Sequence, residues 1–436
     1  QTLATDGCLL ATTTVRFEWA PVLGASYYAT IKNGEYATTT DTQLDIVVRD
    51  FSDYTLEVVA VDAGGQASAT STQAVSVATI PIAINEIAWM GTRANTNDEW
   101  FEIKNNTART IDLAQWEINA KYGAPQVKLA GTIAPHAYLI FERTDDSAVA
   151  DVAMHKKFTN ELENTGDKLI LSYASTTFDQ TPDGAWAAGA TSTRKTMERY
   201  SSRESGADAS NWGTNLGYIK NGKDAKGTAI EGTPGAQNSV STLINKGEDI
   251  TSDFTLTADE ERYVVTSDGV WVQASTTLTI EPGVTVSFYP DAGDFFIQGA
   301  VDAQGTVESP IVFNSFSGAQ EGGFWVDNAT ATSTFDHVRF ENTESIVVSG
   351  SDIEVRNSEF VHTDGGVEAY ENATIFIENT YFASSTSDTI GAYDGSTVHI
   401  ASSTITNQLD DDAIGIYDGS SLIMSSTTID GVHDGS

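Results

Sequence analysis

Short stretches of alternating apolar and polar residues dominate the chain, and most end at Gly, Asn or Asp. Residues 54–62, Tyr-Thr-Leu-Glu-Val-Val-Ala-Val-Asp, alternate over a full strand length. Strict alternation places one set of side chains on each face of a strand, whereas a helix needs apolar residues three and four apart. Runs with helical spacing are scarce. The pattern therefore predicts an all-β chain with many short strands.

The first segment, residues 1–79, is predicted to form a small β-sandwich. Residues 15–19 alternate and bury an aromatic pair, and residues 62–65, Asp-Ala-Gly-Gly, supply a turn. An early Trp19-Ala20-Pro21, a strand with Tyr27-Tyr28 and a corner at Asp53-Tyr54 follow in this order. In this order they resemble a fibronectin type III domain. That resemblance implies a spacer module, with ligand binding left open.

The second segment, residues 80–239, carries a longer series of motifs. Ile84-Asn85-Glu86-Ile87 opens it, and Gly232-Thr233-Pro234-Gly235-Ala236-Gln237-Asn238 closes it. Between them lie residues 98–105, 164–167 and 183–186. In this order the motifs resemble a bacterial lamin tail domain, which implies an immunoglobulin-like sandwich and no particular chemistry. Its acidic residues either hold a cation or organise loops, and both interpretations stay open for Glu86, Asp98, Glu99 and Glu102.

The third segment, residues 240–436, is a repeat. Large apolar residues recur at positions 340, 360, 382, 405 and 429, in steps of 20, 22, 23 and 24. A drifting period near ~22 residues with polar turns predicts a β-solenoid in which equivalent strands stack ~4.8 Å apart. Residues 270–313 and the repeats after them resemble right-handed parallel β-helices of the pectate-lyase type. The predicted fold is thus two β-sandwiches followed by a right-handed parallel β-helix. Since no amphipathic cap precedes Gly435-Ser436, we expect that the protein continues or that another element covers this end.

Charge narrows the set of partners. The chain has 61 acidic and 23 basic residues, a net charge of −38, and residues 240–436 hold 32 acidic and four basic ones. A chain this acidic repels nucleic acid and anionic membranes.

No apolar run is long enough to span a bilayer, and no initiator Met or signal peptide is present, so we expect a piece of a longer protein. The single Cys8 excludes an internal disulfide, and we expect it in a core.

Catalysis is the alternative to a binding role, because many parallel β-helices of this type cleave acidic polysaccharides. A lyase of that kind needs basic residues beside the substrate carboxylate, and the repeats offer Arg339 and Arg356. Asp410-Asp411-Asp412 resembles the paired aspartates of polygalacturonase-type hydrolases, but no Gly-His-Gly follows. The histidines fall in different phases of the coil and predict no nucleophile–base pair; they are His337, His362, His399 and His433.

One tyrosine recurs at the same place in three successive coils: Tyr370, Tyr393 and Tyr417. Strand alternation points these rings outward, next to Gly391 and Gly415, which predicts an accessible ladder that binds a glycan or a protein. The alternative is that the tyrosines cap a corner and pack on a neighbouring turn.

Each tyrosine is followed by a carboxylate, in the order Glu371, Asp394 and Asp418. Stacked like charges repel, so these residues, with Asp412 as a further candidate ligand, either bind Ca²⁺ or splay into solvent.

These features favour a non-catalytic, modular protein of the cell surface, with a structural or adhesive role. Its Ser- and Thr-rich texture is typical of exported bacterial proteins. The expected partners are a surface glycan or protein, or like subunits in self-assembly, without nucleic acid and without membrane insertion. The alternative is a polysaccharide-processing β-helix enzyme, a lyase or a hydrolase, with accessory sandwich domains.

Overall fold

The computed structural model describes Leu3 and residues 9–12, 14–258, 260, 262–407, 409 and 412–431. Cys8, Asp410, Asp411 and His433 lie outside the described residues. The chain divides into two compact units, residues 1–240 and 241–436. Both are built from strands, which confirms the predicted all-β class.

The first part of the first unit is a two-layer structure. Two strands form one sheet: β2 (Thr14–Glu18) and β5 (Gln43–Val47). Five strands form the other: β1 (Leu9–Leu10), β7 (Ser71–Val77), β6 (Ser52–Asp62), β3 (Ala25–Lys32) and β4 (Glu35–Thr39). Both layers contribute to one core, because Phe17 of β2 packs in the same cluster as Leu56 of β6 and Val77 of β7.

The second part of the first unit also buries one core between its sheets. The larger sheet contains β15 (Met154–Lys157), β14 (Tyr138–Glu142), β9 (Trp100–Asn105), β8 (Ile82–Ala88), β18 (Met197–Arg199) and β19 (Trp212–Thr214). The others contain β12 (Gln126–Lys128), β11 (Trp116–Ala120), β16 (Leu169–Tyr173) and β17 (Thr176–Gln180), and the pair β10 (Ile111–Asp112) and β13 (Thr132–Ile133). Trp116 of β11 and Phe101 of β9 belong to the same buried cluster. Three short 3₁₀ turns occur in the described chain: η1 (Ala209–Asn211), η2 (Val240–Thr242) and η3 (Ile244–Gly247).

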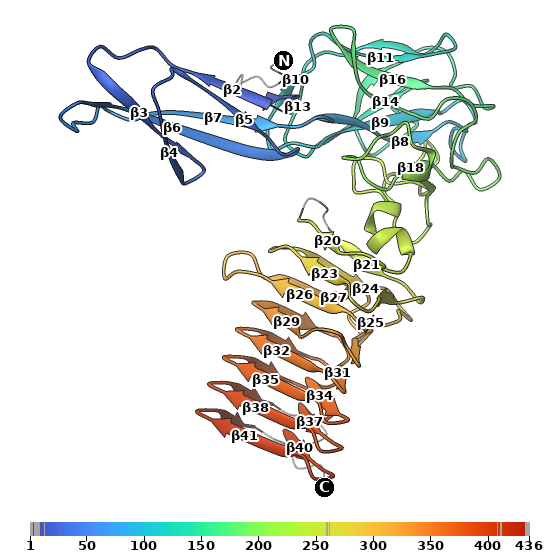
Figure 1. The fold of residues 1–436 in the computed structure, drawn as a ribbon. Helices are drawn as coiled ribbons and strands as arrows, with labels where there is room; N and C mark the ends of the chain where they lie inside the picture. Colours follow the sequence, from blue (N-terminus) through green and yellow to red (C-terminus); the bar gives the residue numbers. More distant parts are fainter. Residues whose placement is uncertain are drawn as a thin grey trace. The chain divides into compact units, whose positions relative to one another are not determined.

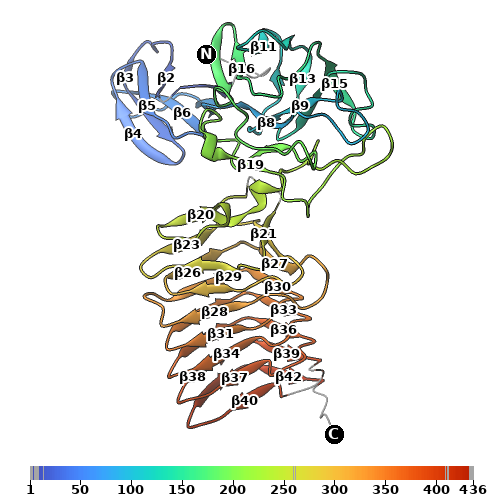
Figure 2. The ribbon, with the colours of Figure 1, turned by 90° about the vertical axis from the view of Figure 1, so that its right-hand side faces the viewer.

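The second unit is a stack of coils with three parallel sheets (Figures 1 and 2). The first sheet contains β20 (Phe254–Leu256), β23 (Thr277–Ile280), β26 (Ala300–Gln304), β29 (Ser333–Asp336), β32 (Asp352–Arg356), β35 (Thr374–Glu378), β38 (Thr397–Ala401) and β41 (Ser421–Ser425). The second contains β21 (Tyr263–Val265), β24 (Thr285–Phe288), β27 (Ile311–Ser315), β30 (Val338–Glu341), β33 (Glu359–Val361), β36 (Tyr381–Ala383), β39 (Thr404–Thr406) and β42 (Thr428–Asp430). The third contains β22 (Val270–Val272), β25 (Phe295–Ile297), β28 (Phe324–Asp327), β31 (Ile346–Ser349), β34 (Val367–Tyr370), β37 (Ile390–Ala392) and β40 (Ile414–Ile416).

The strand register confirms the repeat found in the sequence. Phe340 pairs with Phe360, Phe360 with Phe382, Phe382 with Ile405, and Ile405 with Ile429. The coils grow from 20 to 24 residues, yet each strand keeps its partner, so the additional residues are taken up between strands. This arrangement confirms the predicted parallel β-helix.

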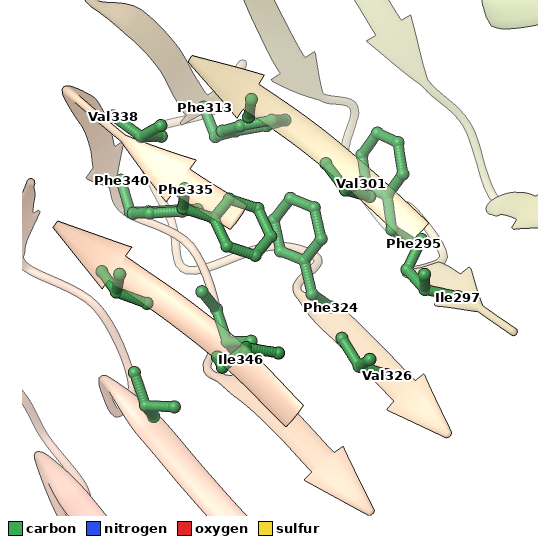
Figure 3. Packing of buried hydrophobic residues seen from close by; sticks show 14 of the residues in the cluster. Phe295, Ile297, Val301, Phe313, Phe324, Val326, Phe335, Val338, Phe340 and Ile346 are labelled. Atoms are coloured by element: carbon green, nitrogen blue, oxygen red, sulfur yellow. The ribbon is translucent and has the colours of Figure 1, made fainter. Parts of the chain in front are cut away.

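The interior of the coils is filled by stacked aromatic rings (Figure 3). Phe313, Phe340, Phe360 and Phe382 stack in sequence, with ring centroids 5.4, 4.5 and 4.8 Å apart. Phe324 meets Phe313 and Phe340 edge to face. Since alternate residues of every rung point inward, identical rings lie over one another and form a continuous apolar column.

The corners of the coils need left-handed backbone. Positive φ values occur at the same corner of successive coils, at His337, Asn357, Asn379, Ser402 and Ser426. Short polar side chains, above all Asn, adopt this conformation more readily than others. Asn379 also donates from Nδ2 to Oδ1 of Asn357 at 2.7 Å, which ties one corner to the next.

Candidate functional site

The three predicted tyrosines form a ladder on the outer side of the third sheet, next to the rungs β34, β37 and β40. The rings of Tyr370 and Tyr393 are 4.7 Å apart with an angle of 8° between their planes. Those of Tyr393 and Tyr417 are 5.1 Å apart at 12°. The rings therefore cover one another's faces at about the spacing of the coils.

Each tyrosine hydroxyl donates to a carboxylate that precedes it in the chain. Tyr370 donates to Glu368 at 2.7 Å, Tyr393 to Asp388 at 3.0 Å and Tyr417 to Asp412 at 3.4 Å. Burial, followed by the hydrogen bond to the carboxylate, raises the pKa of both Tyr370 and Tyr393. The hydroxyls consequently stay protonated and act as donors at neutral pH.

The glycines beside the ladder do not leave the rings open. A Cβ at Gly391 would lie 2.7 Å from the Tyr393 ring, and one at Gly415 would lie 2.5 Å from the Tyr417 ring. The rings of Tyr393 and Tyr417 thus lie over the glycines, and the half-buried rings of Tyr370 and Tyr393 each stack on the tyrosine of the next coil. The rings stack as the register of the coils predicts, which covers the faces between them, and binding of a glycan or protein to the ladder stays a prediction. Tyr417, at 42% exposure, is the most open of the three.

The candidate calcium ligands occupy turns. Glu371, Asp394 and Asp418 all have positive φ, so a turn conformation that short polar residues favour accounts for the repeated position. Glu371 accepts a hydrogen bond from Ser349 at 3.1 Å, and Asp412 accepts the Tyr417 hydroxyl. Within the described residues, no group of three or more His, Cys, Asp or Glu could hold a metal ion. Calcium binding by single stacked carboxylates stays a prediction.

The same sheet carries a second row of outward aromatic residues, which the sequence pattern alone did not single out. Trp271, Phe296 and Trp325 pair in register on β22, β25 and β28. Trp271 and Phe296 stack at 4.3 Å, and Trp325 is 46% exposed. The signal was present, since each is the outward residue between two inward apolar ones.

A groove lies between the two aromatic rows. Figure 2 shows β28, β31 and β34 as successive rungs of the same sheet. On β31 the outward residues are Val347, in register with Trp325, and Ser349, in register with Tyr370, so one aromatic row ends before this rung and the other begins after it. The resulting groove has a volume of about 570 Å³. It is lined by Trp325, Glu344, Ser345, Val347, Ser349, Asp364, Glu368, Tyr370, Glu371 and Asp394.

A smaller groove of about 290 Å³ lies on the outer face of the first sheet. It brings Arg356 together with Glu378 and His399. The His399 ring stacks on Phe376 at 4.6 Å, and Arg356 pairs with Glu354 at 2.9 Å. Both ring and guanidinium are thus engaged by neighbours on the same face.

In the first unit, buried glutamates hold the closing segment, residues 232–240, against the larger sheet. Glu86 accepts hydrogen bonds from the Thr233 backbone at 2.9 Å and from its hydroxyl at 3.1 Å. Gly232 is needed there, because a Cβ would lie 2.5 Å from a carboxylate oxygen of Glu86. Glu102 accepts from the Gly235 N–H at 2.6 Å.

Glu198 completes this group. It accepts from Ser239 at 2.6 Å and from the Val240 backbone at 3.1 Å. Burial raises the pKa of Glu102 to about 8, and burial together with the neighbouring Glu198 and Glu102 raises that of Glu86. Burial likewise raises the pKa of Glu198.

Asp98 and Glu99, the other two acidic residues considered as cation ligands, also have protein partners. Thr144 donates to Asp98 at 2.9 Å, and Arg143 donates to Glu99 at 2.9 Å. Burial raises the pKa of Glu99 to about 7. The contacts of all four carboxylates therefore favour the interpretation that they organise loops.

Comparison with known proteins supports the solenoid. Residues 322–436 match the family model described as right handed beta helix region. No curated protein matches the chain. In the described residues, no helix is long and apolar enough to cross a membrane.

Two solved structures match parts of the chain. One is a DUF4876 family protein from Bacteroides thetaiotaomicron, 15% identical over 33% of this chain and 51% of that one, with a TM-score of 0.15. The other is a chitinase from Bacillus thuringiensis, 16% identical over 37% of this chain and 26% of that one, also with a TM-score of 0.15. This chain thus covers about half of the first and a quarter of the second, and scores this low carry no structural argument.

The buried glutamates predict how the stability of the first unit depends on pH. A carboxyl with a higher pKa in the folded than in the unfolded chain stabilises the fold fully below its unfolded value, near 4.5, and loses this contribution as pH rises to about 8. Residues 1–240, expressed alone, should fold and lose stability across that window in urea titrations. Glu102→Gln, which mimics the protonated form, should flatten the dependence; stability that is constant or rises across the window would contradict the assignment.

The tyrosine ladder predicts a graded loss of stability. Tyr393→Ala removes two ring contacts and should cost roughly 1–3 kcal/mol, whereas Tyr393→Phe removes only the bond to Asp388 and should cost about 1 kcal/mol. Thermal and urea unfolding of the whole chain measure both. An alanine variant as stable as the parent would show that the ladder is solvated surface.

Proposed function

We propose that this chain is part of a non-catalytic, modular protein of the cell surface, with a structural or adhesive role. The observation that carries the proposal is the outer face of the third sheet, where aromatic side chains and carboxylates recur coil after coil on a regular scaffold. A parallel β-helix presents such residues at fixed spacing, because each rung is hydrogen-bonded to the next. A repeating surface of this kind suits an extended partner.

The partner that fits this face best is a glycan. Exposed rings offer flat apolar surfaces, and carboxylates accept hydrogen bonds from hydroxyl groups. A protein partner or assembly with like subunits is the other form of the proposal. The net charge of −38 argues against nucleic acid and anionic lipid.

The first unit would then act as a spacer. Its two parts would correspond to the fibronectin-like and lamin-tail-like modules of the sequence analysis, and the protein would be extracellular. The spacer role is supported by the polar side chains of the closing segment, residues 232–240, which are hydrogen-bonded to buried glutamates.

Ca²⁺ would act on the solenoid by offsetting the repulsion between stacked turn carboxylates.

The competing proposal is a polysaccharide-processing enzyme, and one observation favours it: Arg356, Glu378 and His399 line a common groove. Against it, Arg356 pairs with Glu354, and Arg339 pairs with Glu341 at 3.2 Å and with Glu359 at 2.5 Å. Both guanidinium groups are thereby neutralised, which weakens their ability to stabilise a substrate carboxylate.

A binding and turnover experiment separates the two. The purified chain should cosediment with insoluble cell-surface polysaccharide and release no soluble or unsaturated sugars from it or from polygalacturonate. Product release that Arg356→Ala abolishes would establish the enzyme instead. If the chain does not cosediment with the polysaccharide and forms no ordered fibres or lattices in electron micrographs, the structural and adhesive proposal is left without support.

The calcium proposal has its own measurement. Adding Ca²⁺ should raise the melting temperature of the solenoid and a chelator should lower it, because neutralised stacked carboxylates repel less. Asp394→Asn removes the central charge and should reduce the response, with Asp302→Asn, on the outer face of the first sheet, as the matched control. A melting temperature that does not respond to either addition would contradict a structural ion.

A further inference from the structure

The groove at β31 has the features of a ligand site in its own right. Its walls come from different rungs, with Trp325 on β28 and Tyr370 at the end of β34, and its floor is Val347 and Ser349. A larger residue at position 347 would continue the aromatic column and close the groove. The gap therefore arises where the column of Trp325 ends at Val347, while Tyr370 begins the neighbouring column, in register with Ser349.

Unused polar groups surround this groove. In the described part of the chain, the Trp325 ring stacks on no other ring and its indole N–H has no protein acceptor. Among the same residues, the side chains of Glu344 and Asp394 accept no hydrogen bond and form no ion pair. A ligand that accepts one hydrogen bond and donates several would satisfy all three groups.

All the charged residues that line the groove are acidic. Five carboxylates line the groove: Glu344, Asp364, Glu368, Glu371 and Asp394. No Lys or Arg is among the lining residues. Such a groove repels uronic acids and phosphates and attracts ammonium groups, which aromatic rings also stabilise through cation–π contacts.

The strand pairing argues for a glycan over a peptide. β31 pairs with β28 on one side and with β34 on the other, so an extended peptide finds no free strand edge for main-chain hydrogen bonds. The flat walls and the excess of acceptors instead suit sugar rings with their hydroxyl groups. We propose that this groove binds a glycan that carries free amino groups, with a sugar ring against Trp325 and separate ammonium groups at Glu344, before the start of β31, and at Asp394, after the end of β37. This inference rests on the proposed binding role of the face and specifies its ligand.

The test measures the affinity of the whole chain for a soluble β-1,4-linked glucosamine oligomer by isothermal titration calorimetry, at a mildly acid pH where the amines are charged. Trp325→Ala should weaken binding at least about tenfold, because it removes the wall against which the sugar ring packs. Val347→Trp should do the same by filling the groove, and Glu344→Gln with Asp394→Asn by removing the charge. Trp271→Ala, two rungs away on the same face, is the matched control and should bind like the parent.

Several outcomes would overturn the inference. If Trp271→Ala lowers the affinity for the oligomer as much as Trp325→Ala does, the groove is not the binding site. Unchanged affinity in both Trp325→Ala and Val347→Trp would lead to the same conclusion. If lysine oligomers displace the sugar at equal concentration, the occupant is a basic protein segment. If the N-acetylated oligomer binds as tightly and still depends on Trp325, the amino-group assignment fails while the proposed glycan-binding role stands. Melting curves of each variant separate lost binding from lost folding.

Discussion

The stacking of equivalent residues, one coil above another at ~4.8 Å, is the constraint on which the solenoid depends. It brings equivalent side chains of successive coils into contact, so a repeated residue must be of a type that packs well against another residue of the same type. Phe340, Phe360 and Phe382 meet this condition inside, where stacked rings fill the core. Asn357 and Asn379 meet it at a corner, where one amide donates to the other.

The same constraint shapes the outer face. Tyr370, Tyr393 and Tyr417 stack because their strands are in register, and the stacking uses the ring faces that a ligand would otherwise contact. A site arises where the repetition fails: Val347 stands below Trp325, and the missing ring leaves a groove. On a repetitive scaffold, the exceptional rung therefore holds more information about binding than the regular ones.

In the first unit, the constraint is to supply hydrogen-bond acceptors for the closing segment, residues 232–240. This segment lacks strand pairing over much of its length, so its backbone N–H groups need other acceptors. Glu86, Glu102 and Glu198 supply them from within the sheet. Burying three carboxylates near one another is costly unless they bind protons, and their raised pKa values follow from this.

The sequence by itself determined the all-β class, the charge break near Val240 and the register of the last coils, because a two-residue alternation and a spacing near 22 residues are local patterns that can be counted. It also placed Tyr370, Tyr393 and Tyr417 in one column. It did not determine that their rings would lie over Gly391 and Gly415, nor that Val347 would open a groove beside Trp325. Those features depend on which side chains face the same gap from different coils, and only the tertiary structure decides how such distant residues share space.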